Sequence, residues 1–249
     1  MRRPQHAPSG PPGDGPTFRA VPLWSAEPPH TKLHPEDRVG LALISTIIRC
    51  KKGEIIQHDG GRANAVFSVV SGMGKLFKVL PGNKMHIVSF LFPDDMFGMA
   101  ERGLYTHSAM AITDVTLYRI PITLFQALMR QNARLNFQMV AKLCEVMRED
   151  QRHAYLLNKK SVVAQLAFFI VLLREKQVDR GGSATNIELT MSRLDIAAYI
   201  GISPEAVSRA LHELVTRGVI AFRDRHHVTV TESDALEQLA EDREATPER

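Results

Sequence analysis

Residues 192–215 read SRLDIAAYIGISPEAVSRALHELV, and this stretch decides how the C-terminal part of the chain folds. Ser192 and Asp195 have the S-x-x-D spacing of a capping box, in which two side chains satisfy the first backbone N–H groups of a helix. Gly201 then supplies a sharp turn, because glycine adopts positive φ without steric cost. The pattern predicts a short helix that ends in a tight turn.

A second helix is predicted directly after this turn. Ser203 is a suitable N-cap, and Pro204 suits the first helical position, where its missing N–H does no harm. Helical periodicity places two rows of side chains on different faces. The apolar row is Val207, Leu211 and Leu214, and the polar row is Glu205, Ser208, Arg209 and His212. Helix, turn and helix form a helix-turn-helix, whose second helix enters the major groove of DNA.

The polar row has the chemistry to read base edges. Arg209 can donate two hydrogen bonds to guanine, and Glu205 can accept one from cytosine. The alternative is an ordinary solvated face, since Glu205 and Arg209 also form an i,i+4 ion pair worth only a few tenths of a kcal/mol. The capped first helix and the tight turn favour DNA recognition.

Composition bounds the class of protein. The 249 residues suit one large or two modest domains, and an apolar share of 44% is enough for real cores. The richest apolar run, residues 162–173, is shorter than the roughly 20 residues needed to span a bilayer. No apolar run follows Arg2 and Arg3, so we expect no secretory signal. Cys50 and Cys144 are too few for a disulfide scaffold and suit a reducing cytoplasm.

Charge is unevenly spread although the net value is only +4. Residues 159–230 carry ten Lys and Arg against seven Asp and Glu, whereas residues 231–249 carry two against seven. A basic segment followed by an acidic tail fits phosphate contact by the former and solvation of the latter.

The residue pattern of the first half of the chain changes twice. Residues 1–30 hold eight of the fourteen prolines, so we predict a disordered tail over residues 1–32, followed by a helix through Ile48. Residues 50–120 alternate short apolar runs with glycine turns, which predicts an all-β barrel or jelly roll. Its clearest hairpin turns at residues 81–83.

A long helical stripe follows Pro121. The stripe contains Leu135, Met139, Leu143, Val146, Asp150, His153 and Leu157. One interpretation is a helix that packs on its own barrel, and the other is a coiled-coil seam between two protomers. We favour the seam, because a helix-turn-helix that binds an operator usually works as a dimer. Asp150 would then tune dimer strength or lie at a wet edge.

The remaining pieces complete a winged helix. Ser161 can cap an apolar helix that runs to Lys176, and residues 187–189 suit a short strand. After the second helix of the motif, residues 219–222 and 227–230 predict a strand pair, or wing. Its basic turn includes Arg225, which would lie along phosphates unless it is simply a charged exposed turn.

In this order the chain resembles the Crp/Fnr family of bacterial transcription regulators, over roughly residues 33–240. Two segments carry the resemblance to the Fnr and FixK branch. One is Asp150-Gln151 followed by Leu156-Leu157-Asn158-Lys159-Lys160 and Leu166-Ala167, and the other is Leu189-Thr190-Met191-Ser192-Arg193 leading to Asp195-Ile196 and the E-x-x-S-R pattern of Glu205, Ser208 and Arg209.

The resemblance implies an α+β fold with three working parts. They are a cyclic-nucleotide-binding-like β-roll over residues 33–132, a dimerisation helix over 133–158 and a winged helix-turn-helix domain over 159–240, with an acidic tail at 241–249. It also implies a cytoplasmic homodimer that binds double-stranded DNA at a palindrome of the TTGAT–N4–ATCAA kind. By the same resemblance it touches RNA polymerase as an activator, at genes of low-oxygen respiration, denitrification or nitrogen fixation.

The resemblance also implies roles for single residues. Arg209 would read the guanine, Glu205 a cytosine or adenine of the opposing strand, and Ser208 a thymine or a nearby phosphate. The further DNA contacts that we expect are His212, Ser203, Ser192, Arg193 and Arg225. Lys159 and Arg225 are expected to contact phosphates, so that changing either one weakens binding to all sequences alike.

Two family cofactors do not suit this sequence. An Fnr-type iron–sulfur cluster needs four thiolates, yet no cysteine precedes Cys50 and Tyr118 stands where the β-roll cysteine belongs. In the cyclic-nucleotide cassette, Met99 replaces a glutamate and His107-Ser108 replaces an arginine pair, with only Glu101 to compensate. Losing the guanidinium removes the strongest anion contact. We therefore expect no cofactor and leave the effector open.

Other sensing or catalytic chemistry has weak signals. We interpret Cys50 and Cys144 as inert core residues, although lysines and arginines lie near both in sequence. His226-His227 is the only close histidine pair, so no metal-ligand set is expected. No catalytic motif occurs, and we predict that the protein is not an enzyme. Two alternatives stay open: a ligand-sensing module that acts on a protein partner, and a haem- or redox-responsive version of the same regulator.

Overall fold

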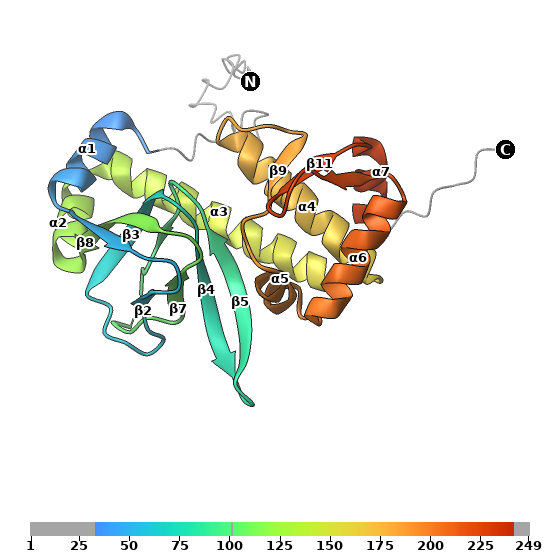
Figure 1. Cartoon of the computed structure of the whole chain (residues 1–249). Helices are drawn as coiled ribbons and strands as arrows, with labels where there is room; N and C mark the ends of the chain where they lie inside the picture. The colour runs from blue at the N-terminus through green and yellow to red at the C-terminus, as the bar shows by residue number, and fades with distance from the viewer. Residues whose placement is uncertain (1–32, 101, 242–249) are drawn as a thin grey trace, which may run out of the picture.

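The computed structural model describes residues 33–100 and 102–241. The predicted disordered tail, Glu101 and the last eight residues lie outside this part of the chain. The first domain contains α1 (Pro35–Leu43), β1 (Thr46–Cys50), β2 (Ile55–Gln57), β3 (Ala65–Ser71), β4 (Gly74–Leu80), β5 (Lys84–Leu91), β6 (Met96–Phe97), β7 (Ser108–Ala111), β8 (Val115–Pro121) and α2 (Ile122–Gln131). It is the predicted β-roll (Figure 1).

Two antiparallel sheets form this roll, in the orders β1-β8-β3-β6 and β2-β7-β4-β5. Alternate residues of each strand point between the sheets, and aromatic rings fill the space. The rings of Phe67 and Phe97 stack with centroids 5.1 Å apart, and Tyr105 packs beside them with its hydroxyl bonded to the Ala65 carbonyl at 2.9 Å. The hairpin predicted at residues 81–83 joins β4 to β5, as expected.

The helix predicted to run through Ile48 is shorter than expected. α1 ends at Leu43, and Thr46 begins β1, which pairs with β8 from Thr46↔Arg119 to Cys50↔Val115. The β-branched residues of this strand suit a pleated sheet, and pairing with a strand distant in sequence decided their conformation.

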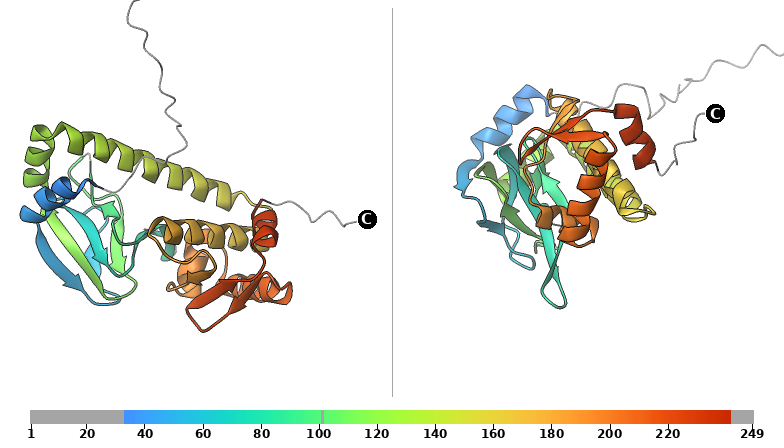
Figure 2. Two further views of the ribbon diagram at one scale, coloured as in Figure 1. Left: turned by 90° about the horizontal axis from the view of Figure 1, so that it is seen from above. Right: turned by 45° about the vertical axis from the view of Figure 1, so that its right-hand side comes forward.

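The helix α3 (Ala133–Leu157) is a long rod along one side of the molecule, with the β-roll under its first half and the second domain under the rest (Figure 2, left). The side chain of Asn132 caps it by accepting a hydrogen bond from the Leu135 N–H at 2.9 Å. Leu135 and Met139 pack against Ile120 and Phe125 of the β-roll.

The second domain is a winged helix-turn-helix. It contains α4 (Val162–Asp179), β9 (Asn186–Glu188), α5 (Arg193–Ile200), α6 (Pro204–Thr216), β10 (Ile220–Phe222), β11 (His227–Val230) and α7 (Ser233–Ala240). The three strands pair in the order β10-β11-β9. α4 is apolar on nearly every face because α3, α6 and α7 surround it.

One hydrophobic core continues from the β-roll into the second domain. Phe90 and Phe92 at the end of β5 belong to the same buried cluster as Phe169 of α4 and Tyr199 of α5. The two domains therefore share buried apolar surface as well as a linking helix. Among the described residues, no helix is long and apolar enough to cross a membrane.

Two glycines with the same backbone angle provide a matched stability test. Gly72 and Gly201 both have φ of 83°, but an added Cβ at Gly72 would meet the Asp114 carbonyl oxygen at 2.2 Å, whereas Gly201 has open space. We expect Gly201→Ala to lower the free energy of unfolding by about 1–2 kcal/mol, the cost of left-handed backbone. Gly72→Ala should cost about 3 kcal/mol or more, because overpacking adds to that strain.

Chemical denaturation of both variants measures the difference. Equal losses of unfolding free energy would contradict the close approach of the Gly72 turn to the Asp114 backbone.

Candidate nucleic-acid interface

The helix-turn-helix has the local geometry that the sequence predicts. The Asp195 N–H donates to the Ser192 hydroxyl at 3.1 Å, and the Ser192 N–H donates to the Asp195 carboxylate at 3.1 Å, which completes the capping box. Gly201 takes the left-handed conformation at the end of α5. The Ser203 hydroxyl accepts from the Ala206 N–H at 3.2 Å and starts α6.

The two faces of α6 separate as predicted. Val207, Leu211 and Leu214 are buried in the domain core. On the opposite side the polar row, Glu205, Ser208, Arg209 and His212, is exposed. Ser208, Arg209 and His212 line a shallow open groove together with Glu213 and Thr216. α6 lies at the outer side of its domain, away from the β-roll (Figure 1).

The charges on this face suit a base edge. Hydrogen bonds from its own backbone N–H and from Ser203, with help from the Arg209 charge, hold the pKa of Glu205 below its usual range. Glu205 is therefore ionised at pH 7 and can only accept hydrogen bonds. Within the described part of the chain no ion pair engages Arg209, so its guanidinium is open to a ligand.

The other predicted contact residues have partly structural roles. The hydroxyls of Ser192 and Ser203 are used in the caps of α5 and α6. Arg193 is half-buried, with its guanidinium 5.2 Å from the centre of the Phe222 ring, so it joins α5 to the wing. These side chains hold the starts of α5 and α6 and the wing in place.

The wing tip is an ordered turn. The Asp224 carboxylate accepts from the backbone N–H groups of His226 at 2.7 Å and His227 at 3.0 Å, and it lies 2.8 Å from the His227 ring nitrogen. Its negative charge offsets part of the basic character that the sequence suggested for the tip. Arg223 and Arg225 remain exposed and supply positive charge at the wing tip.

Lys159 does not lie on the DNA-facing surface. The sequence led us to expect a phosphate contact from Lys159, as from Arg225, but the Lys159 side chain is buried. Its ammonium lies 4.0 Å from the centre of the Tyr155 ring and 5.3 Å from that of Phe168. Lys159 therefore joins the end of α3 to α4, and that interpretation of it is corrected.

The predicted stripe on α3 is also corrected in part. Leu135 and Met139 are buried against the β-roll, and His153 is buried against Tyr199, so these three residues do not face a partner. Leu143, Val146, Asp150 and Leu157 are exposed. The predicted stripe therefore mixes residues from the buried side of α3 with residues from its exposed side. Residues on both sides repeat with helical spacing, so the sequence did not separate them.

A different exposed row on α3 was missed. It consists of Phe137, Val140, Cys144 and Met147, followed by Gln151 and Ala154, all exposed, at alternating steps of three and four. This spacing is the heptad signal that was assigned to the neighbouring stripe. Cys144 is exposed in this row rather than being a core residue, whereas Cys50 is half-buried and burial raises the pKa of its thiol.

The β-roll differs from a cyclic-nucleotide site at the residue that would meet the phosphate. The rings of Phe67, Phe97 and Tyr105 fill the space between its sheets. Burial, followed by the nearby charge of Lys78, lowers the pKa of His107, so it is neutral at pH 7 and does not replace the cationic arginine. Within residues 33–100 and 102–241, no group of three His, Cys, Asp or Glu side chains is placed to hold a metal.

Comparison with known proteins agrees with this architecture. Residues 47–132 match the cyclic nucleotide-binding domain, and residues 164–239 match the Crp-like helix-turn-helix domain. The nitrogen fixation regulation protein FixK of Rhizobium meliloti is 30% identical, over 83% of this chain and 92% of that protein. The chain belongs to the Crp/Fnr family.

Further relatives from the Crp/Fnr family are also similar to this chain. The transcriptional activator protein anr of Pseudomonas aeruginosa is 31% identical over 76% of this chain and 78% of its own length. The structure of FixK2 from Bradyrhizobium japonicum superposes with a TM-score of 0.73 at 26% identity, covering 79% of this chain and 97% of that one. The protein is therefore a Crp/Fnr-type DNA-binding transcription regulator and not an enzyme. Members of this family typically act as dimers.

Lys159 and Arg225 should now behave differently. We expect Lys159→Met to lower the free energy of unfolding by about 1–2 kcal/mol, because a desolvated cation–π contact is lost. Arg225→Met should change stability by less than about 0.5 kcal/mol but reduce the salt slope of DNA binding by about one. Thermal unfolding and salt titration of DNA binding measure both effects. A lower salt slope for Lys159→Met would restore its earlier assignment.

Proposed function

We propose that this Crp/Fnr regulator binds a TTGAT–N4–ATCAA-like palindrome as a homodimer. The observation that carries the proposal is the exposed row on α6, in which Glu205 and Arg209 stand one turn apart on a face that nothing else in the described chain covers. Arg209 reads guanine through two hydrogen bonds, Glu205 accepts from a base of the opposing strand, and Ser208 contacts a thymine or phosphate.

The surrounding residues supply contacts to the DNA backbone. His212 extends the row on α6 toward the sugar-phosphate backbone. Ser192 and Arg193 contribute from the start of α5, Ser203 from the start of α6, and Arg225 from the wing. Contacts of this kind set the register of a protein on the duplex and carry no sequence information.

The biological role that we propose follows the named relatives. FixK of Rhizobium meliloti is a nitrogen fixation regulation protein, and anr of Pseudomonas aeruginosa is a transcriptional activator. We propose a cytoplasmic activator that contacts RNA polymerase at genes of low-oxygen respiration, denitrification or nitrogen fixation.

The homodimer is proposed to pair through the exposed row on α3. The side chains of Phe137, Val140, Cys144 and Met147 are exposed in the single chain. One side of the α3 rod is covered by neither domain (Figure 2, left). Leu143 and Leu157 flank this row and remain candidate dimer contacts. An exposed apolar row with heptad spacing favours a second, identical helix as its cover.

Arg209→Ala tests the reading of the guanine. We expect the variant to lose about 1–3 kcal/mol of binding to the palindrome, with relaxed choice at the guanine position, because a bidentate contact is removed. Titration of labelled duplexes that carry each base at that position measures the effect. Arg217→Ala is the matched control, since Arg217 lies at the end of the same helix and pairs with Glu213.

Two results would contradict the proposal. One is an Arg209→Ala variant as tight and as selective as the wild type. The other is wild-type binding that is weak and blind to sequence, which would favour a module that acts on a protein partner. An absorption spectrum of the purified protein tests the haem-responsive version.

Val140→Asp tests the dimer face. Val140 is 56% exposed in the single chain, and a carboxylate at this position would be buried between two helices in the proposed dimer. We expect a monomer in sedimentation experiments and at least about tenfold weaker binding to the palindrome, because unpaired buried charge costs several kcal/mol. Val39→Asp on α1, where the valine is 59% exposed, is the control and should stay dimeric. A dimeric Val140→Asp protein would rule out this face.

A further inference from the structure

The N-terminal end of α5 is tied to the β-roll by an ion pair. The Lys75 ammonium on β4 lies 2.6 Å from the Asp195 carboxylate, and only 9% and 13% of these side chains are exposed. Burial by itself would raise the pKa of Asp195, but hydrogen bonds from Lys75 and Ser192 lower it below its usual range. The same carboxylate therefore caps α5, the first helix of the DNA-binding motif, and pairs with Lys75 of the β-roll.

The other end of α5 is tied down at Tyr199. Its ring stacks on that of His153 with centroids 3.9 Å apart, and the Phe90 ring of β5 lies 5.1 Å away. The His153 Nε2 lies 2.8 Å from the Tyr199 carbonyl oxygen, which only accepts, so this nitrogen carries the proton. α3 and β5 thus hold the C-terminal end of α5.

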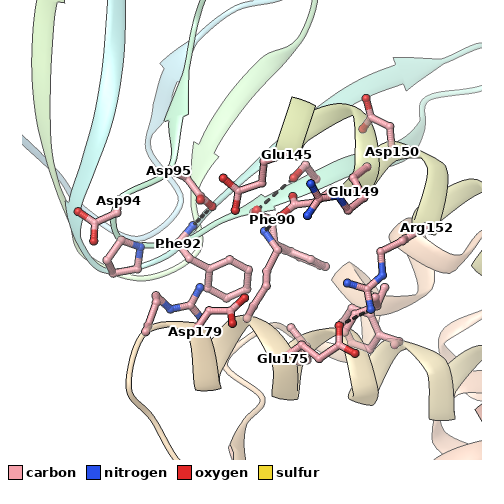
Figure 3. Close-up of a pocket in the computed structure, with 18 of the residues that line it drawn as sticks. Phe90, Phe92, Asp94, Asp95, Glu145, Glu149, Asp150, Arg152, Glu175 and Asp179 are labelled. Carbon is pink, nitrogen blue, oxygen red and sulfur yellow. Dashed lines mark hydrogen bonds and ion pairs between the residues drawn. The ribbon is translucent and has the colours of Figure 1, made fainter. Parts of the chain in front are cut away.

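Two ion pairs join α3 to α4 next to α5. The Lys176 ammonium lies 2.6 Å from the Glu149 carboxylate, and Arg152 pairs with Glu175. Figure 3 shows the Arg152–Glu175 pair beside the cavity that these helices border with β5. The second domain is therefore held on α3 independently of the contacts of α5 with β4.

These attachments determine the direction of the recognition helix. α5 lies between β5 and α6, and it is joined to α6 by the Gly201 turn and by a shared core. Asp195 and Tyr199 are one helical turn apart, about 6 Å along the axis. Tyr199 and the α3–α4 ion pairs hold the domain near the C-terminal end of α5, and the bond to Lys75 fixes the N-terminal end to the β-roll.

We propose that Lys75 is a positioning residue for DNA recognition: through Asp195 it holds α6 at one angle to the β-roll. The inference rests on the proposed binding of a palindrome by a dimer. Two recognition helices that are each held at one angle reach half-sites at one separation only. A swivelling pair would tolerate several separations and bind each of them less well.

Spacer selectivity measures this role directly. Labelled TTGAT palindromes with three, four and five central base pairs are titrated with the full-length protein. We expect the wild type to prefer its best spacer by about tenfold, comparable to the cost of a mismatched base pair. Lys75→Met should reduce that preference to about threefold or less and weaken binding at the best spacer. Lys75→Arg, which keeps the charge, should restore both.

Arg174→Met is the matched control. It removes the 2.7 Å pair between Arg174 and Glu237, which joins α4 to α7 inside the second domain, so spacer preference should not change. Lys75→Gln provides a second variant, and thermal unfolding shows that each protein is folded. Since a purely structural loss lowers binding at all spacers alike, the preference ratio separates positioning from damage.

The outcomes separate the two proposals. Wild-type protein that binds the palindrome no better than random DNA would contradict the proposed function. Wild-type protein that selects the palindrome, combined with Lys75 variants that keep the full spacer preference or bind more tightly, would overturn the positioning role alone.

Discussion

A nearly buried carboxylate at the start of α5 connects the two domains. Removing a carboxylate from water is costly unless hydrogen bonds and an opposite charge replace the lost hydration. Asp195 meets that requirement with Ser192 of its own motif and with Lys75 of the β-roll, 120 residues earlier in the chain. The local cap and the long-range tie therefore depend on each other, and the helix-turn-helix is placed relative to the β-roll as a result.

α6 and α3 each have one side that is buried in the chain and one side that is exposed. α6 buries Val207 and Leu214 and leaves Glu205 and Arg209 in solvent, so its core side holds a polar edge at the surface. α3 instead covers two domains with one side and leaves an apolar row on the other. Apolar surface in solvent is unfavourable, and in the proposed homodimer the same helix of a second copy would cover it.

The β-roll keeps the family architecture, and aromatic rings pack in its core. Phe67, Phe97 and Tyr105 pack where the two sheets face each other, and Tyr105 satisfies its hydroxyl on the Ala65 backbone. Stacked rings stabilise the roll without a ligand. The contacts of β4 and β5 with α5 then let this domain act as a rigid support for the DNA-binding domain.

Local signals in the sequence determined most of the fold and the readable face of the recognition helix. The capping box, the glycine turn and the Ser203-Pro204 start depend on neighbouring residues only, and each was predicted correctly. Tertiary structure decided the rest. Lys159 is buried between Tyr155 and Phe168, Leu135 and Met139 face the β-roll, and Lys75 meets Asp195, because each position depends on elements that only the folded chain brings together. Periodicity reveals that a helix has an apolar side, but not which neighbour covers it.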